Sequence, residues 1–230
     1  MAWTKTEANS LLAIDQQVGK HYFSPSAYEI IRRVIYETGD FDYVSHLHFS
    51  DRALSAGAAA LAARTAIVVD VPLIQTAIAP VAQNCFANSI YAPWEHHRSY
   101  TLPTLAKRHP EGIFVIGQQQ RTLSTFLDLL DHEQIKPALA VMTNPKFIQM
   151  DEIEAKLEAL TVPHIRVIGR KGNASVAVGI LNGLIDLLGK FIPNPKLSKL
   201  SCPNSKPLPI LTNSKNKPGL RSMLSQLFVR

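Results

Sequence analysis

The sequence predicts an α/β fold of three layers with a mainly parallel central sheet, followed by a basic, Pro-rich C-terminal tail. Short apolar segments recur along the chain, and segments with helical spacing separate them. Alternation of this kind is typical of right-handed crossovers and of a sheet that helices cover on both faces. The hydrophobic share of 46% and the charged share of 18% are typical of a globular domain.

Four segments are predicted to be strands because they are mostly apolar or β-branched rather than alternating. They are 66–70 (AIVVD), 113–117 (IFVIG), 138–142 (ALAVM) and 164–168 (HIRVI). Strands of this composition are buried on both faces of a sheet. Because ligands of such folds bind beyond the carboxyl ends of the strands, we expect the site among the loops that follow these segments.

Helices are predicted between the strands. In the segment from Ser24 to Gly39, Ser24 is the expected N-cap, Pro25 the first helical residue and Gly39 the expected end. Further segments share apolar residues at three- and four-residue spacing. They are 51–64, 122–132, 151–160 and 175–191. The expected N-cap of the first of them is Ser50 or Asp51.

The chain is expected to divide into a folded domain, residues 1–189, and a disordered extension, residues 190–230. The extension contains eight Lys or Arg, no Asp or Glu, and six of the fifteen prolines, a composition that resists packing. The domain contains sixteen basic against eighteen acidic residues, a net charge of −2. The positive charge therefore belongs to the extension, and we expect no nucleic-acid partner.

Membrane and secreted proteins are excluded by what the sequence lacks. No apolar run reaches the ~18 residues of a transmembrane helix, and the first residues lack the charged and apolar regions of a signal peptide. Cys85 and Cys202 stand at no metal or redox spacing and indicate a reducing compartment. We therefore expect a cytoplasmic protein with no membrane partner.

Common motifs for phosphate binding, nucleophilic catalysis and zinc hydrolysis are also absent. The histidine pairs His46/His48 and His96/His97 lack further ligands at zinc-like spacing, so no metal is expected. The segment 169–173 (GRKGN) brings backbone N–H groups and two cations to a predicted helix N-terminus, which suits a carboxylate or a phosphate. Glycine-rich turns of this kind also occur for purely geometric reasons.

The segment 30–50 (IIRRVIYETGDFDYVSHLHFS) resembles the signature of the precorrin-8X methylmutase (cobalt-precorrin-8 methylmutase) family, roughly R-x-I-H-x-x-x-D-F-D. Arg33 stands at the arginine of that signature, and Tyr36 stands at its histidine. The likeness covers about residues 8–189. Asn9-Ser10, expected just before a helix, stands at an Arg-Ser pair of the family.

Further blocks carry the same resemblance in the same order. Asp70 stands at the family aspartate that follows an Ala-rich run, and Arg98-Ser99 stands in its T-R-S-A-A-A block. The segment 113–130 (IFVIGQQQRTLSTFLDLL) is similar to V-x-A-I-G-N-A-P-T-A-L-F-x-L-L. The segment 169–184 (GRKGNASVAVGILNGL) is similar to G-R-x-G-G-S-x-x-A-A-A-x-x-N-A-L.

The resemblance implies a three-layer α/β homodimer with active sites near the subunit interface and an isomerisation without a cofactor. In that reaction a methyl group moves from C-11 to C-12 of precorrin-8X or cobalt-precorrin-8, giving hydrogenobyrinic acid or cobyrinic acid. The corrinoid substrate is a large apolar macrocycle with carboxylates at its edge. We expect Arg33, Arg98 and Arg170 to pair with these carboxylates. Ser10 and Asp70 complete the expected substrate-binding set, although Asp70 suits a capping role equally well.

Tyr36 is the expected catalytic residue, because the resemblance gives the family histidine the task of protonating or hydrogen-bonding a ring nitrogen. A phenol has a reference pKa of ~10 against ~6.5 for an imidazole, which makes it the weaker full proton donor near neutral pH. It can still donate a hydrogen bond. The alternative is an aromatic side chain that only packs in the core.

Three loops on the expected ligand side depart from the family pattern. The P-V-G-F-V-G turn becomes 144–149 (NPKFIQ) and loses both glycines. The Asn of I-G-N becomes Gln118, followed by Gln119, Gln120 and Arg121 in place of small residues, and G-G-S becomes Gly172-Asn173-Ala174. We expect these bulkier, more polar residues to narrow the pocket or change its specificity while the fold survives.

Two other functions remain open from the sequence. One is a paralogue that binds corrinoids or other tetrapyrroles without turning them over. The other is an interaction protein that uses residues 190–230 to recruit a partner or nucleic acid. The α/β pattern distinguishes none of these, because a fold does not determine a function.

Overall fold

A computed structural model of the chain describes residues 4–93 and 101–189. Within these residues the strands form one six-stranded sheet. They are β1 (Leu47–Phe49), β2 (Ile67–Val69), β3 (Ile90–Tyr91), β4 (Ile113–Ile116), β5 (Leu139–Met142) and β6 (His164–Val167). Their order across the sheet is β1-β6-β5-β4-β2-β3. All neighbouring pairs are parallel except β1 and β6.

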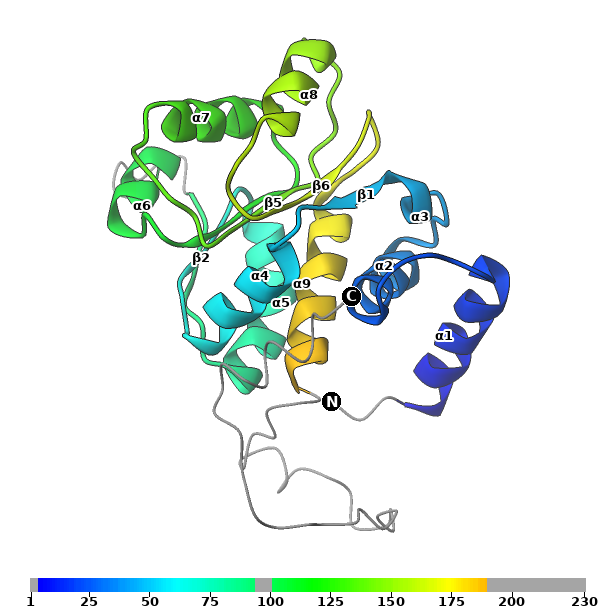
Figure 1. The fold of residues 1–230 in the computed structure, drawn as a ribbon. Coiled ribbons are helices and arrows are strands. Elements are labelled where there is room, and N and C mark those ends of the chain that lie inside the picture. The colour runs from blue at the N-terminus through cyan, green and yellow to red at the C-terminus, as the bar shows by residue number, and fades with distance from the viewer. Residues whose placement is uncertain (1–3, 94–100, 190–230) are drawn as a thin grey trace.

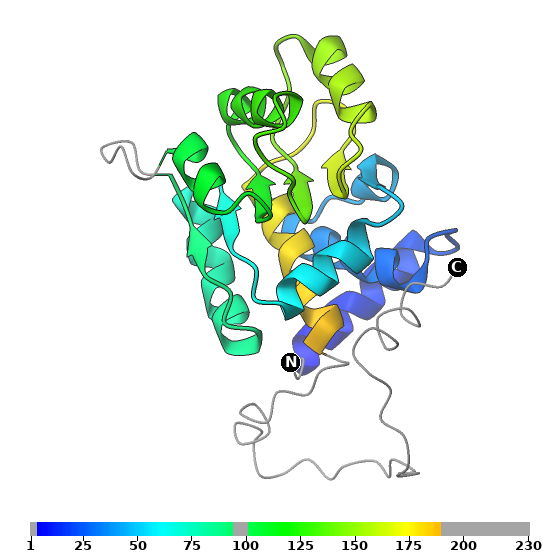
Figure 2. The same cartoon turned by 60° about the vertical axis from the view of Figure 1, so that its left-hand side comes forward.

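Helices cover both faces of this sheet (Figure 1). They are α1 (Lys5–Val18), α2 (Pro25–Thr38), α3 (Tyr43–His46), α4 (Ala53–Ala62), α5 (Pro72–Cys85), α6 (Leu102–Arg108), α7 (Gln120–Asp131), α8 (Met150–Glu158) and α9 (Ala174–Gly189). One layer contains α6, α7 and α8, and the other contains α2, α4, α5 and α9 (Figure 2). The predicted α/β class and the mainly parallel sheet are confirmed. The expected tail, 190–230, lies outside the described residues.

Each central strand sends alternate side chains into two separate cores. Ile113 and Val115 of β4 join the core around α9, while Phe114 and Ile116 join the core under α7. This double burial is the reason the strand segments read as continuous apolar runs. The four predicted strands are confirmed. Strands β1 and β3 were not predicted, because their residues are not buried throughout and therefore form no continuous apolar run.

The ends of α2 are confirmed as the sequence predicts them. The hydroxyl oxygen of Ser24 accepts a hydrogen bond from the N–H of Ala27 at 3.3 Å. Gly39 is left-handed, with φ 69°, and its N–H donates to the carbonyl of Ile35 at 2.7 Å. These two caps determine which turns of the helix carry the family signature.

Two expectations about helix starts are wrong. Neither Ser50 nor Asp51 caps α4: the N-cap position is Arg52, whose side chain makes no capping bond. The Ser50 hydroxyl instead accepts from the N–H of His164 at 2.8 Å and so links the end of β1 to β6. Ser10 lies inside α1 rather than before a helix, because Thr4 and Glu7 form a capping box that starts the helix earlier.

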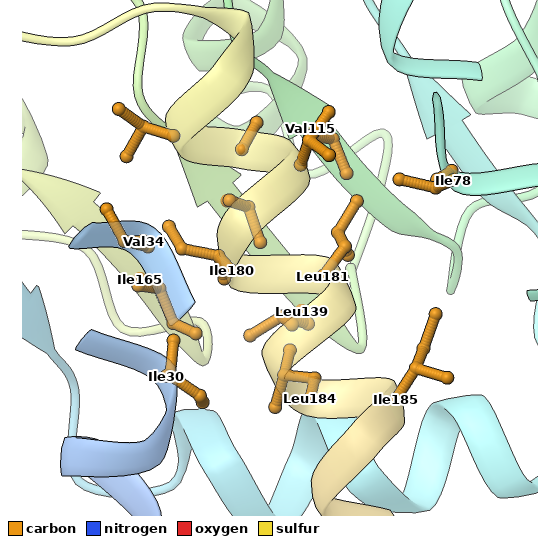
Figure 3. Packing of buried hydrophobic residues seen from close by; sticks show 14 of the residues in the cluster. Ile30, Val34, Ile78, Val115, Leu139, Ile165, Ile180, Leu181, Leu184 and Ile185 are labelled. Carbon is orange, nitrogen blue, oxygen red and sulfur yellow. The ribbon is translucent and has the colours of Figure 1, made fainter. Parts of the chain in front are cut away.

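Helix α9 lies at the centre of the larger core and packs along α2. Gly179 faces Val34, where an added Cβ would lie 2.9 Å from the Val34 Cα. One turn later Gly183 faces Ile30, where the corresponding distance is 3.1 Å. Figure 3 shows Ile30 and Val34 on the α2 side of this core, with the apolar side chains of α9 beside them. The two glycines therefore allow the backbones to approach closely.

We expect Gly179→Ala to lower the free energy of unfolding by about 1–3 kcal/mol, because the new methyl group would push α2 away from α9. Urea denaturation followed by circular dichroism measures the change. Gly189→Ala is the matched control on the same helix, since a Cβ there meets nothing within 4 Å. Equal stabilities for the Gly179→Ala variant and the unchanged protein would contradict this account of the packing.

Candidate active site

Arg33 and Tyr36 lie together on one side of α2, near its C-terminal end. The guanidinium carbon of Arg33 is 5.2 Å from the centroid of the Tyr36 ring, within the range of a cation–π contact. Arg33 also pairs with Glu37 at 2.9 Å and approaches Asp186 of α9 at 3.9 Å. A substrate carboxylate at this site would therefore share the cation with two carboxylates of the protein.

Tyr36 is partly buried and packs against the core around α9. Beside its neighbour Arg33 there is a cavity of about 10 Å³. It is lined by Leu11, Glu29, Arg32, Arg33, Gly183 and Asp186. This space suits one water molecule and is far too small for a macrocycle.

Ser10 lies on α1, the helix that packs outside α2. Its hydroxyl donates to the carbonyl of Thr6 at 3.0 Å, and the next residue, Leu11, lines the small cavity beside Arg33. The two helices are joined at Asp15, which accepts from the Tyr28 hydroxyl at 2.7 Å and from Arg32 at 3.0 Å. Partial burial and the hydrogen bond to Asp15 raise the pKa of Tyr28 to about 12.

Asp70 is buried at the end of β2, where both of its carboxylate oxygens accept hydrogen bonds from backbone N–H groups. The oxygens accept from the N–H groups of Gly117 at 3.0 Å, Gln118 at 2.8 Å and Gln119 at 2.8 Å. The capping role that the sequence left open is therefore present, and the capped segment leads into α7 rather than into the helix after Asp70. Direct contact between this carboxylate and a substrate stays a prediction.

Lys171 joins the end of α2 to the glycine-rich loop before α9. Its ammonium group binds Asp40 at 3.0 Å and also binds Asp42, both of which follow Gly39. Although desolvation opposes the effect, hydrogen bonds from the Asp42 N–H and from Lys171 lower the pKa of Asp40. The two carboxylates raise the pKa of Lys171. The opposite charges of the D-F-D and GRKGN motifs were the signal in the sequence for this missed contact.

The loop 169–173 is fixed on both sides of the exposed Arg170. Gly172 touches the loop after β5, since a Cβ there would lie 2.1 Å from the carbonyl oxygen of Thr143. The side-chain oxygen of Asn173 accepts from the N–H groups of Ser175 at 2.9 Å and Val176 at 3.2 Å. The N–H groups of Ser175 and Val176 at the start of α9 therefore donate to Asn173 and not to a bound anion. Of the two cations in the loop, Arg170 is exposed and Lys171 is partly buried.

The glutamines that depart from the family pattern connect neighbouring loops. Gln118 accepts from the N–H of Ala174 at 3.4 Å, at the start of α9. The side-chain oxygen of Gln120 accepts from the N–H groups of Phe147 at 3.3 Å and Ile148 at 3.5 Å. These contacts hold the three loops in one arrangement. The expected effect on pocket size and specificity stays a prediction.

A larger cavity, of about 520 Å³, lies at the opposite edge of the sheet. Its walls include three alanines of α4 and Ala63 just after it, together with Ala66, Gly112 and Ala138, the residues that precede β2, β4 and β5. It contains none of the predicted site residues. The structure thus brings Arg33 and Tyr36 together and places Ser10 on the neighbouring helix, while Asp70 and Arg170 belong to separate loops.

Two further predictions concern metal binding and residues outside the described ranges. Across 4–93 and 101–189, no group of three or more His, Cys, Asp or Glu side chains is arranged to hold a metal ion. Arg98, His96 and His97 lie outside the described residues. In the same part of the chain, no helix combines the length and the apolar character needed to span a bilayer.

Comparison with known proteins connects this geometry to a family. The family model described as precorrin-8X methylmutase matches residues 5–187. A cobalt-precorrin-8 methylmutase of Synechocystis sp. is 32% identical over 201 residues, which cover 77% of this chain and 93% of the relative. A cobalt-precorrin-8 methylmutase of Methanocaldococcus jannaschii is 34% identical over 169 residues, which cover 71% of this chain and 80% of the relative.

A solved structure shares the fold as well. The precorrin-8X methylmutase from Thermus thermophilus aligns with a TM-score of 0.74 at 27% identity, over 82% of this chain and 99% of the relative. The overall fold therefore occurs in a relative of similar extent. Since the family model also spans most of the chain, this protein belongs to the precorrin-8X methylmutase family.

Proposed function

We propose that this chain moves a methyl group from C-11 to C-12 of precorrin-8X or cobalt-precorrin-8, with Tyr36 in the place of the family histidine. As a member of the family, the chain is an isomerase of cobalamin biosynthesis. The observation that supports the role of Tyr36 is its place on α2, partly buried and 5.2 Å from the Arg33 guanidinium.

The chemistry of this pair fits the proposed step. The phenol of Tyr36 donates a hydrogen bond to a ring nitrogen, which draws electron density from the macrocycle and weakens the bond between C-11 and its methyl group. As the phenol donates, negative charge develops on its oxygen. The nearby Arg33 cation stabilises that charge. The methyl group forms its new bond at C-12, and the proton remains with, or returns to, Tyr36.

The substrate-binding set follows from the same proposal. Arg170 is exposed, so it can bind a carboxylate at the macrocycle edge without leaving another partner. Arg33 binds by sharing its charge with Glu37, and Ser10 by rotating its hydroxyl away from α1. Asp70 acts through the loop 117–119 that it holds, and Arg98 completes the set.

We also propose that the chain works as a homodimer in the cytoplasm, as the resemblance implies. In support of this assembly, the cavity beside Arg33 in the described part of the chain is about 10 Å³, so a macrocycle next to Arg33 needs further walls. A second copy of the chain would supply them. The proposed assembly makes the active site a shared surface.

Tyr36→Phe should reduce kcat by about 100-fold, because the variant removes the only proton that the side chain can donate. The measurement is conversion of freshly prepared precorrin-8X, followed by visible absorbance. Tyr36→His should convert the substrate at least as fast as the unchanged protein.

Tyr22→Phe is the control for this substitution, since the Tyr22 side chain is fully exposed. It should leave turnover unchanged. Conversion by the Tyr36→Phe variant at the rate of the unchanged protein would overturn the role of the phenol. Binding of the corrinoid without conversion by any form of the protein would indicate a non-catalytic paralogue.

Asp70→Asn is expected to lower the free energy of unfolding by about 2–3 kcal/mol, because an amide cannot accept from three N–H groups with two charged oxygens. Chemical denaturation measures this change. Asp128→Asn, an exposed position on α7, is the control and should have little effect. An unchanged stability with a raised KM would assign Asp70 to the substrate instead of the loop.

The homodimer can be tested by analytical ultracentrifugation of the full chain. The sedimenting species should have twice the mass of one chain, which is 25.4 kDa. A single species with the mass of one chain, at the concentrations that support turnover, would refute the shared site.

A further inference from the structure

The loop between β5 and α8 contains a lysine, Lys146, whose side chain is completely buried. The ammonium group of Lys146 donates to the carbonyl of Val167 at 2.7 Å and lies 3.2 Å from a carboxylate oxygen of Glu154. Lysine is almost never buried to this degree without a partner. Burial lowers the pKa of Lys146, and the Glu154 carboxylate opposes that change. The ion pair between Lys146 and Glu154 therefore links this loop to α8.

Glu154 of α8 connects three separate segments. One of its oxygens receives Lys146 and also accepts from the N–H of Gly169 at 3.2 Å. Its other oxygen pairs with Arg166 of β6, whose side chain is 4% exposed. Arg166 points to this face because its strand alternates: Ile165 and Val167 enter the core around α9. One carboxylate thus determines the positions of β6, the loop 144–149 and the loop 169–173.

The two loops carry side chains suited to a corrinoid. Phe147 and Ile148 follow Lys146 directly, and their side chains are 73% and 67% exposed. Their backbone N–H groups are held by Gln120. Arg170 follows Gly169 directly and is exposed. Because both loops follow the carboxyl ends of neighbouring parallel strands, they stand at the same edge of the sheet.

We propose that Glu154 and Lys146 are positioning residues that fix these loops before the substrate binds. Phe147 and Ile148 contact the apolar face of the macrocycle, and Arg170 pairs with a carboxylate at its edge. This role rests on the proposed function. A preformed arrangement improves binding, because the loops are ordered during folding and not when the ligand arrives.

The charges themselves support a positioning role over a stabilising one. Burying an ion pair costs desolvation free energy, and well-packed apolar side chains often do the same structural task at lower cost. Here a glycine of the family pattern is replaced by a lysine whose ammonium group reaches across to β6. Through Lys146 and Gly169, the Glu154 carboxylate contacts both the loop 144–149 and the loop 169–173.

The first test measures the loops without any ligand. In Glu154→Gln, amide hydrogen exchange should become about tenfold faster at Gly169 and in the segment 146–149, since the charged acceptor is lost. Lys146→Met should accelerate exchange in 146–149. The matched controls are Glu152→Gln, an exposed position on α8, and Lys156→Met, which removes an exposed ion pair with Asp131 at 3.3 Å. Both controls should exchange like the unchanged protein.

The second test separates binding from chemistry. Glu154→Gln should raise KM about tenfold and leave kcat within about twofold, because the pair touches no reacting atom. Glu154→Asp should recover part of the loss. If Lys146→Met fails to fold, the double substitution of Phe147→Ser and Ile148→Ser keeps the proposal testable. It alters only exposed side chains and should raise KM in the same way.

Each result has a distinct meaning. Unchanged exchange in both loops of Glu154→Gln would overturn the positioning role, as would a fall in kcat with KM unchanged. Absence of turnover by the unchanged protein, together with the expected exchange pattern, would refute the proposed function and leave the link between the loops established.

Discussion

The close contact between α2 and α9 is the constraint on which the rest of the structure depends. Gly179 and Gly183 present no side chain, so Val34 and Ile30 lie directly against the α9 backbone. The register between the two helices then determines where the last turn of α2 meets the first turn of α9. Tyr36 lies on the former, and the loop 169–173 precedes the latter. The candidate site is therefore positioned by packing in the core.

Carboxylates organise the edge of the sheet where the site is expected. Asp70 holds the loop after β4, Glu154 holds the loops after β5 and β6, and the pair Asp40 and Asp42 holds Lys171. In each case a charged oxygen accepts hydrogen bonds from a different segment. Such charge-assisted hydrogen bonds are stronger than those between neutral groups. Loops built in this way are ordered without a ligand. That order suits the recognition of a rigid macrocycle.

The structure also explains why glycines could be lost from the ligand-side loops. The side chain of Lys146 is buried, and its ammonium group binds the Val167 carbonyl and the Glu154 carboxylate. Gln149 adopts a left-handed conformation, with φ 51°, at a position where the family pattern has a glycine. A residue with a side chain tolerates that conformation at a cost of about 1–3 kcal/mol when the surroundings determine it. The hydrogen bonds from the N–H groups of Phe147 and Ile148 to Gln120 fix the backbone next to Gln149 in this way.

Local patterns in the sequence determined the four strands β2, β4, β5 and β6, the caps of α2 at Ser24 and Gly39, and the alignment of Tyr36 with the family histidine. Burial on both faces and capping leave their signal within a few consecutive residues. The tertiary structure alone decided that Lys171 binds Asp40, 131 positions away, and that Asp70 turns its oxygens toward 117–119. It also decided that Lys146 is buried. A charged side chain takes its partner from whatever packing brings near. Opposite charges in two motifs show that they could pair, but only the packing shows which segments meet.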